Sequence, residues 1–417
     1  MVVYNRIMEN KVTFHLSKFW RRVIALVCVV AMLVSMFSYL ASVSISPEDG
    51  IGADALARHD DFVNADAAER AQTAAASLFS RNQDFTSNYQ KASVYIGKAE
   101  YEKALACIEN CIELLKGTTV STELSDDVWL KYGCLQAVLG QYDQALDGFA
   151  HMSPKSEYRN ESELISAQIA LERMDMSGAY IHLTAYLDCA PQDATVYGLY
   201  ANVCYYTKRI EQAQRWYSKA EEAGIALDGS EYLLWGMCLM DTGDYAGAQV
   251  KLTAALDSGY EDKGLCLSQL AVCSYLQGNY ADVLEKGAQA LEAGSDTVDE
   301  GMLRFYMGMS AFSTEDYDTA IACFDAAQEE QCAEQGLWFY RGFSKMLKDD
   351  NAGAIEDFTV CVDAQADLTD SALLYRGICY LQSGDTKRAK EDLTLAVQSQ
   401  DKDISKSAQN LLWQLPK

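Results

Sequence analysis

The sequence predicts an all-α solenoid of about nine helix–turn–helix repeats, wound into a right-handed superhelix and preceded by one transmembrane helix. The first observation is an apolar residue that returns every 34 to 41 residues. It stands at Ala104, Ala145, Ala179, Ala213, Ala248, Val283, Ala320, Ala354 and Ala389. The second is a seven-residue phrase around that residue, such as "GDYAGAQ" from Gly243, and the third is a total of only four prolines. A period near 34 suits two helices and two turns per repeat.

The N-terminus predicts a single-pass membrane anchor. Residues 23–43 contain no charged side chain, and 21 residues at about 1.5 Å each can span a hydrocarbon core. Five Lys or Arg residues precede them, so the positive-inside rule places residues 1–22 in the cytoplasm and the repeats outside. A cleaved signal peptide is the alternative, although its apolar region is usually about 7–15 residues. The sequence favours an uncleaved anchor in the cell membrane.

The segments after the anchor have distinct compositions. Residues 44–65 are rich in Ser, Gly and Asp and are expected to form an exposed linker. Residues 66–79, "DAAERAQTAAASLF", predict a helix that caps the repeat array of residues 66–403. Residues 404–417 are expected to cap the other end, with a helix over 404–415.

The repeated phrase has a structural explanation. The Gly before the Tyr allows a positive φ, which ends the first helix of a repeat. An Asp, Asn or Gln next to it suits the start of the second helix. A small residue in the first helix, such as Gly133, Ala201 or Gly342, lets the two backbones approach closely. A single repeat cannot bury its apolar face alone, so the stack of repeats must do so.

These motifs resemble the tetratricopeptide repeat family over roughly residues 86–400. The second repeat shows the family pattern well, with residues Trp129, Gly133, Gly140, Tyr142, Ala145 and Phe149. Pro191 ends the third repeat at the family's proline position, whereas Val283 and Gly287 depart from the pattern in the sixth.

Arginine and aspartate recur at matched positions in the last two repeats. Arg341 precedes Gly342, Asp357 stands in the second helix, and Arg376 and Asp392 repeat this spacing in the ninth repeat. We therefore expect an Arg–Asp pair between the two helices of each repeat. In the seventh repeat both positions are apolar, so a structural role is favoured over ligand binding.

The thirteen cysteines also follow the repeat. Cys238, Cys273 and Cys379 share a first-helix position, whereas Cys111 and Cys361 share a second-helix position. Such positions favour small buried thiols. Disulfides and metal sites stay open as alternatives, since free thiols are unusual in an oxidising compartment.

Composition and motifs disfavour several functions. The net charge of −26 argues against nucleic acid as a partner, because phosphate backbones require Lys and Arg. Phosphate-binding Gly-rich loops, H-E-x-x-H and G-x-S-x-G do not occur in the sequence. We predict no catalytic residue, no cofactor and no metal.

The resemblance implies that a partner would bind the concave surface lined by the first helices. The positions flanking the small residue become aromatic and Met-rich in the later repeats, which suits an apolar or amphipathic peptide. Core packing between successive first helices is the alternative explanation. The candidate residues are Asn202, Tyr205, Met237, Met240, Tyr275, Phe305, Met309, Phe312, Phe339, Phe343 and Met346.

The sequence therefore predicts a non-catalytic scaffold that binds proteins or peptides at the outer face of a bacterial membrane. One alternative is an enzyme or an enzyme subunit without a recognisable active site. Another is an adaptor that faces the cytosol, if the membrane orientation is inverted. The oligomeric state stays open.

Overall fold

The computed structural model describes residues 51, 56, 79–116, 121–334, 336–365 and 367–415. These residues form 19 α-helices and one 3₁₀ turn, and none of them lies in a strand. The expectation of an all-α helical repeat fold is confirmed. The described chain divides into two compact units between Leu227 and Asp228, here called the N-terminal unit and the C-terminal unit.

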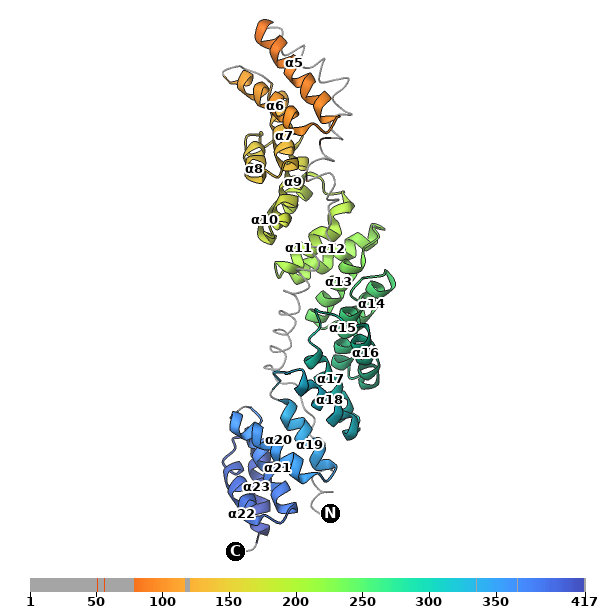
Figure 1. The fold of residues 1–417 in the computed structure, drawn as a ribbon, viewed down its shortest axis with the longest axis vertical. Coiled ribbons are helices and arrows are strands. Elements are labelled where there is room, and N and C mark those ends of the chain that lie inside the picture. The colour runs from red at the N-terminus through yellow and green to blue at the C-terminus, as the bar shows by residue number, and fades with distance from the viewer. Residues whose placement is uncertain are drawn as a thin grey trace. The chain divides into compact units, whose positions relative to one another are not determined.

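The N-terminal unit contains four helix pairs, in which the first and second helices of each repeat pack together (Figure 1). The pairs are α5 (Phe79–Ile96) with α6 (Tyr101–Leu115), α7 (Thr122–Val138) with α8 (Tyr142–Ala150), α9 (Arg159–Glu172) with α10 (Met176–Cys189), and α11 (Tyr197–Tyr206) with α12 (Ile210–Glu222). The 3₁₀ turn Ala194–Val196 leads directly into α11.

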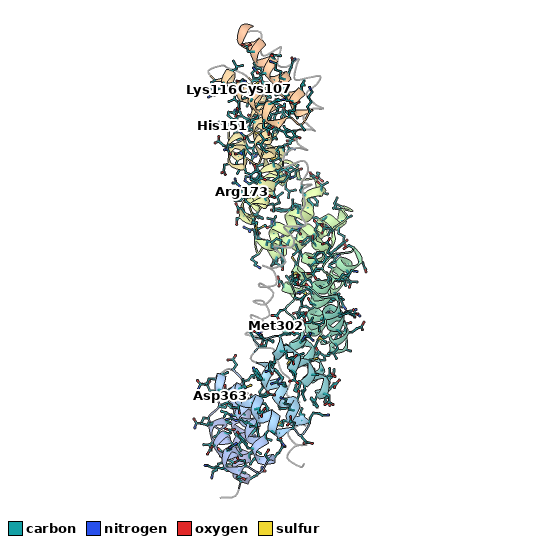
Figure 2. The ribbon with its side chains drawn as sticks, in the orientation of Figure 1. Cys107, Lys116, His151, Arg173, Met302 and Asp363 are labelled. Atoms are coloured by element: carbon teal, nitrogen blue, oxygen red, sulfur yellow. The ribbon has the colours of Figure 1, made fainter. Side chains whose placement is uncertain are left out.

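The C-terminal unit contains five more pairs and a last helix. The pairs are α13 (Gly229–Thr242) with α14 (Tyr245–Asp257), α15 (Lys263–Gln277) with α16 (Tyr280–Ala293), α17 (Glu300–Ser313) with α18 (Tyr317–Glu329), α19 (Gly336–Leu347) with α20 (Asn351–Ala364), and α21 (Thr369–Gln382) with α22 (Thr386–Ala396). Helix α23 (Lys402–Gln414) packs against α21 and α22, close to the range predicted for a terminal helix. Side chains such as Met302 of α17 fill the space between helices (Figure 2).

The recurring apolar residue marks the second helix of every pair. All nine side chains, from Ala104 in α6 to Ala389 in α22, are 0% exposed. Even Val283, which departs from the alanine pattern, is completely buried in α16. The repeat period read from the sequence is therefore confirmed in all nine helix pairs.

Close approach of the paired helices explains the small residue in the first helix. A Cβ atom built on Gly308 of α17 would lie 2.6 Å from the ring of Phe324 in α18. One built on Gly133 of α7 would lie 2.3 Å from the ring of Phe149 in α8. Both distances are far below van der Waals contact, so glycine lets the aromatic ring lie directly on the backbone.

The turn inside each pair uses the left-handed conformation in all nine repeats, as predicted for the glycine-containing turns. The residue before the N-cap of the second helix has a φ between 54° and 85°. Only four of these residues are glycines, and the other five are Ala99, Met174, Lys208, Glu315 and Asp349. Backbone geometry therefore recurs more strictly than residue type.

Aspartate at the next position caps the second helix in five repeats. The carboxylate of Asp244, for example, accepts a hydrogen bond from the Gly247 amide at 3.0 Å. Asp175, Asp316, Asp350 and Asp385 cap their helices in the same way. Gln141 and Asn279 do not, contrary to the expectation for these residue types. The Asn279 amide instead donates to Gln277.

Several N-terminal predictions fall outside the described residues. They are the cytoplasmic segment 1–22, the transmembrane segment 23–43 and most of the helix predicted over 66–79. Among the helices that the structure describes, none is sufficiently long and apolar to cross a membrane. Two residues of the expected exposed linker, Ile51 and Leu56, are 6% and 3% exposed and belong to the core of the first two repeats. At these two residues the linker is buried, because each apolar side chain removes its surface from water there.

Candidate functional site

The Arg–Asp pair of the eighth repeat joins α19 to α20 as predicted. Arg341 donates to Asp357 through Nε at 3.0 Å and through Nη2 at 2.6 Å. Arg341 Nη1 also donates to Asp325 of α18 at 2.7 Å, and Lys345 Nζ lies 2.9 Å from Asp357 Oδ2. A fork of this geometry positions both side chains. Arg341 therefore links three helices.

The ninth repeat reproduces this pair between α21 and α22. Arg376 donates to Asp392 through Nε at 2.7 Å and Nη2 at 2.8 Å, and through Nη1 to Thr359 of α20 at 3.0 Å. Hydrogen bonds to Asp392 raise the pKa of Arg376 above its usual value. Both arginines are committed to carboxylates inside the fold, which supports their structural interpretation.

A buried polar cluster in the first two repeats was missed by the sequence reasoning. Lys131 of α7 is 2% exposed, and its Nζ donates to Asp127 Oδ1 at 2.7 Å and to the Tyr89 hydroxyl at 2.6 Å. The Tyr89 hydroxyl of α5 in turn donates to Asp127 Oδ2. Burial and the carboxylate of Asp127 raise the pKa of Tyr89, so the phenol stays protonated. An Asp followed four residues later by Lys inside an apolar helix was the available signal.

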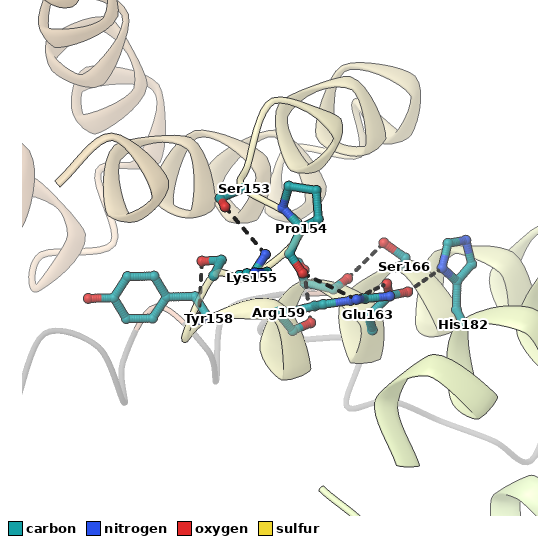
Figure 3. A network of polar contacts seen from close by, with 10 residues as sticks. Ser153, Pro154, Lys155, Tyr158, Arg159, Glu163, Ser166 and His182 are labelled. Carbon is teal, nitrogen blue, oxygen red and sulfur yellow. Dashed lines mark hydrogen bonds and ion pairs between the residues drawn. The ribbon is translucent and has the colours of Figure 1, made fainter. Parts of the chain in front are cut away.

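A second polar network joins α9 to α10 (Figure 3). His182 Nδ1 lies 2.8 Å from Glu163 Oε2, and Arg159 Nε lies 3.4 Å from Glu163 Oε1. Arg159 also donates to the Pro154 carbonyl at 3.3 Å. Hydrogen bonds from His182 and then Arg159 lower the pKa of Glu163. These contacts hold α9 against α10, and the ionised carboxylate of Glu163 is the partner of His182.

The described cysteines are mostly buried, as the repeat register predicts. Cys238, Cys273 and Cys379 are all 0% exposed, and the twelve described cysteines are free thiols. Burial raises the pKa of Cys111 and Cys361 to about 12, so the nucleophilic thiolate is scarce at neutral pH. Within the described ranges, no three His, Cys, Asp or Glu side chains form a group that could hold a metal ion.

Seven of the eleven candidate binding residues are buried in helix packing. Tyr205 is 0% exposed, and Asn202 accepts a hydrogen bond from the buried Tyr217 hydroxyl. The seven are Asn202, Tyr205, Met237, Met240, Phe305, Phe339 and Met346. The alternative of core packing therefore describes their positions, and a partner could reach them only if the helices moved apart.

The other four candidates, Tyr275, Met309, Phe312 and Phe343, are half-buried in the C-terminal unit. The rings of Phe312 and Phe343 lie 5.7 Å apart, and that of Phe343 lies 4.6 Å from Tyr375. Their outer surfaces stay accessible while their inner surfaces contact the core of α17, α19 and α21. Whether they bind a partner stays a prediction.

Two further half-buried residues extend this set at the same repeat position. Val272 follows Ala271, Met309 follows Gly308, Phe343 follows Gly342 and Ile378 follows Gly377. We define the apolar stripe as Val272, Tyr275, Met309, Phe312, Phe343 and Ile378. The equivalent positions of the second, third and fourth repeats hold Cys134, Gln168 and Asn202, so these three repeats offer no such stripe there.

Sequence models of the tetratricopeptide repeat match residues 85–114 and residues 371–400. No curated protein matches the chain. A tetratricopeptide repeat protein from Parabacteroides merdae is similar in structure, at 16% identity and a TM-score of 0.39, over 61% of this chain and 99% of that chain.

Two other solved structures are also similar. YrrB, described as a TPR protein with an unusual peptide-binding site, is 21% identical with a TM-score of 0.38, over 48% of this chain and 96% of that chain. The C-terminal part of a TPR repeat-containing protein from Cytophaga hutchinsonii is 15% identical with a TM-score of 0.45, over 58% of this chain and 97% of that chain. The two sequence matches, which fall on the first and the ninth helix pair, support the tetratricopeptide repeat family for this chain.

Proposed function

We propose that this protein is a non-catalytic scaffold that binds protein or peptide partners through the apolar stripe. Tetratricopeptide repeats typically form interaction scaffolds, and YrrB is a similar protein described as binding peptide. The observation that carries the proposal is the row of half-buried apolar side chains on α15, α17, α19 and α21. Apolar groups that are packed beneath and accessible above can exclude water from a partner without rearranging the core.

The proposal also includes a membrane anchor at residues 23–43, with the repeats on the extracytoplasmic side. Its support is the uncharged 21-residue run and the Lys and Arg residues before it. A scaffold held at the membrane surface would concentrate its partner there. The alternative of a catalytic subunit gains no support from the polar networks of the described residues, because those networks join helices to one another.

Site-specific cross-linking tests the binding surface. A photoreactive residue replaces Met309 of the stripe in the full-length chain, and a control variant carries it at Val250, which is 63% exposed on α14. We expect adducts of defined mass at position 309 that are absent at position 250. Adducts of equal yield at both positions would show non-specific contact and would contradict the proposal.

Thiol labelling tests the membrane orientation. Cys189, at the end of α10, is exposed, whereas every other described cysteine is buried or half-buried. A maleimide that cannot cross membranes should label Cys189 in intact spheroplasts, and Cys189→Ser should remove the label. Labelling only after permeabilisation would place the repeats in the cytoplasm and would overturn this part of the proposal.

A further inference from the structure

We propose that the partner segment held by the apolar stripe is a basic amphipathic helix, with Lys or Arg side chains on both sides of its apolar face. The inference rests on the proposed function and adds the charge of the partner. It depends on which charged side chains on the helices and turns around the stripe are already paired and which are exposed.

The cations beside the stripe are already bound to carboxylates of the fold. Arg304 of α17 lies 3.1 Å from Glu300, and Lys348, after α19, lies 2.8 Å from Asp318. Arg341 and Lys345 share Asp357, and Arg376 holds Asp392. An acidic partner would have to compete with these carboxylates of the same chain for each of the five named cations.

Exposed carboxylates instead follow the stripe at the turns after α17 and α19. Phe312 is followed by Glu315 and Asp316, and Phe343 by Asp349 and Asp350, all four of them exposed. Asp316 and Asp350 each accept a backbone hydrogen bond as a helix cap. Of the ion pairs within the described residues, none includes Glu315 or Asp349. Negative charge thus borders an apolar surface in two consecutive repeats.

Two kinds of force would then act on a basic amphipathic helix. Its apolar face would remove Met309, Phe312 and Phe343 from water, as in other helices bound by apolar surfaces. Its cations would be attracted by the turn carboxylates, an interaction that acts over a Debye length of about 8–10 Å and would raise the association rate and the specificity. A second copy of this chain fits poorly, because two chains of net charge −26 repel each other.

Labelled model peptides of about 18 residues test the inference on the purified full-length chain by fluorescence anisotropy. The first peptide places Leu on one helix face and Lys on the other. The second replaces every Lys by Glu, and the third scrambles the first so that the apolar face is lost. We expect the first to bind at least about tenfold more tightly than the other two, and its affinity to fall about tenfold between about 50 and about 300 mM salt.

Matched variants separate the turn carboxylates from the overall acidity of the protein. The double variant Glu315→Gln/Asp349→Asn should lower the affinity for the basic peptide about fivefold and make that affinity less dependent on salt. The control Glu356→Gln/Glu391→Gln makes the same change of charge at exposed sites of α20 and α22 and should leave the affinity within about twofold. Equal losses in both variants would overturn the inference.

The apolar part is tested by Phe343→Ala, with Val250→Ala as the control. Circular dichroism and the melting temperature verify that each variant is folded. If Phe343→Ala reduces binding but the acidic peptide binds more tightly than the basic one, the proposed function stands and the basic partner is overturned. If Phe343→Ala binds every peptide as the wild-type chain does, the stripe is not a binding surface and both proposals fail. Self-association that Phe343→Ala removes would identify a second copy as the occupant and would overturn the inference.

Discussion

The beginning of the N-terminal unit and the end of the C-terminal unit both bury charge, but they connect it differently. At the beginning, Lys131 and Asp127 lie one turn apart on α7 and reach the preceding repeat through Tyr89. At the end, Arg376 of α21 joins Asp392 of α22 and also reaches the preceding repeat at Thr359. The backbone conformation repeats along the chain, but different residues make the polar contacts between neighbouring repeats.

This difference shows which parts of a repeat are constrained. Positions that decide how closely two backbones approach must keep small or fixed side chains, as Ala104 and Gly308 do. Positions that join one repeat to the next need only satisfy buried polar groups, so either a Lys–Asp–Tyr cluster or an Arg–Asp fork can occupy them. The two connections should then differ in how much stability each one provides.

The largest effect is expected for Lys131→Met. The change leaves Asp127 buried without its cation, which should lower the free energy of unfolding by about 3–5 kcal/mol. Urea unfolding followed by circular dichroism measures the loss, and amide hydrogen exchange should locate it in α5 to α8. As a control, Arg173→Met breaks the exposed pair with Asp143 and should cost no more than about 1 kcal/mol. Similar losses in both variants would contradict the role of the buried cluster.

Breaking an Arg–Asp pair of the last two repeats should lower the free energy of unfolding by less than Lys131→Met does. Arg376→Met removes the cation bonded to Asp392 and should cost about 3 kcal/mol. Arg341→Met should cost less, about 1–2 kcal/mol, because Lys345 stays 2.9 Å from Asp357. Urea unfolding of the two variants side by side checks the order. Arg341 Nη1 also donates to the side-chain oxygen of Gln328 in α18. If Arg341→Met is the more damaging variant, the contacts with Asp325 and Gln328 contribute more than the remaining lysine can replace.

A carboxyl group without a cation partner should affect the dependence of stability on pH in the opposite way to a carboxyl group that is paired with a cation. Burial raises the pKa of Glu231, at the start of α13, to about 7. The folded state therefore binds its proton more tightly than the unfolded state, and the stability from this group is lost as the pH rises from about 4.5 to about 7. Glu231→Gln retains an acceptor for the Asp228 amide and should add about 1–2 kcal/mol near pH 7.5, after allowance for solvent screening.

Melting temperatures across this pH range check the Glu231 prediction, and the benefit of Gln should vanish below about pH 4.5. Glu163 provides the contrast, because hydrogen bonds from His182 and Arg159 lower its pKa. Its contribution to stability is present above its unfolded pKa and is lost as the pH falls, so Glu163→Gln should cost most at neutral pH. A Glu231→Gln variant with the same pH profile as the wild type would contradict the assignment.

The smallest effects are expected at the turns, where both units share the same left-handed conformation. Met174 has a φ of 58°, which strains an L side chain, so Met174→Gly should stabilise the chain by about 0.5–1 kcal/mol. Gly243 has a φ of 84°, and Gly243→Ala should destabilise it by about 1 kcal/mol. Thermal unfolding of the two variants shows whether each change raises or lowers the stability. A loss of stability in Met174→Gly would mean that its side chain contributes more than the strain removes.

Features that recur in the sequence were predictable, whereas features that occur once were not. The nine buried positions and the Arg–Asp pairs repeat at a fixed spacing, and repetition reveals which residues face each other. The cluster of Tyr89, Asp127 and Lys131 occurs only in the first two repeats, so no second copy indicated that residues 42 positions apart meet. The same holds for the candidate binding residues, because the sequence predicted their position in the repeat but not their burial.

By itself, the sequence determined the helix pairs, their turns and the buried face of each second helix, because these depend on periodicity and on contacts between nearest neighbours. Only the tertiary structure decided which first-helix side chains stay accessible. Phe339 and Phe343 stand one turn apart on α19, yet Phe339 is buried and Phe343 is half-buried. Accessibility depends on the side chains of the adjoining repeats, such as Phe312 and Tyr375, and these vary from one repeat to the next.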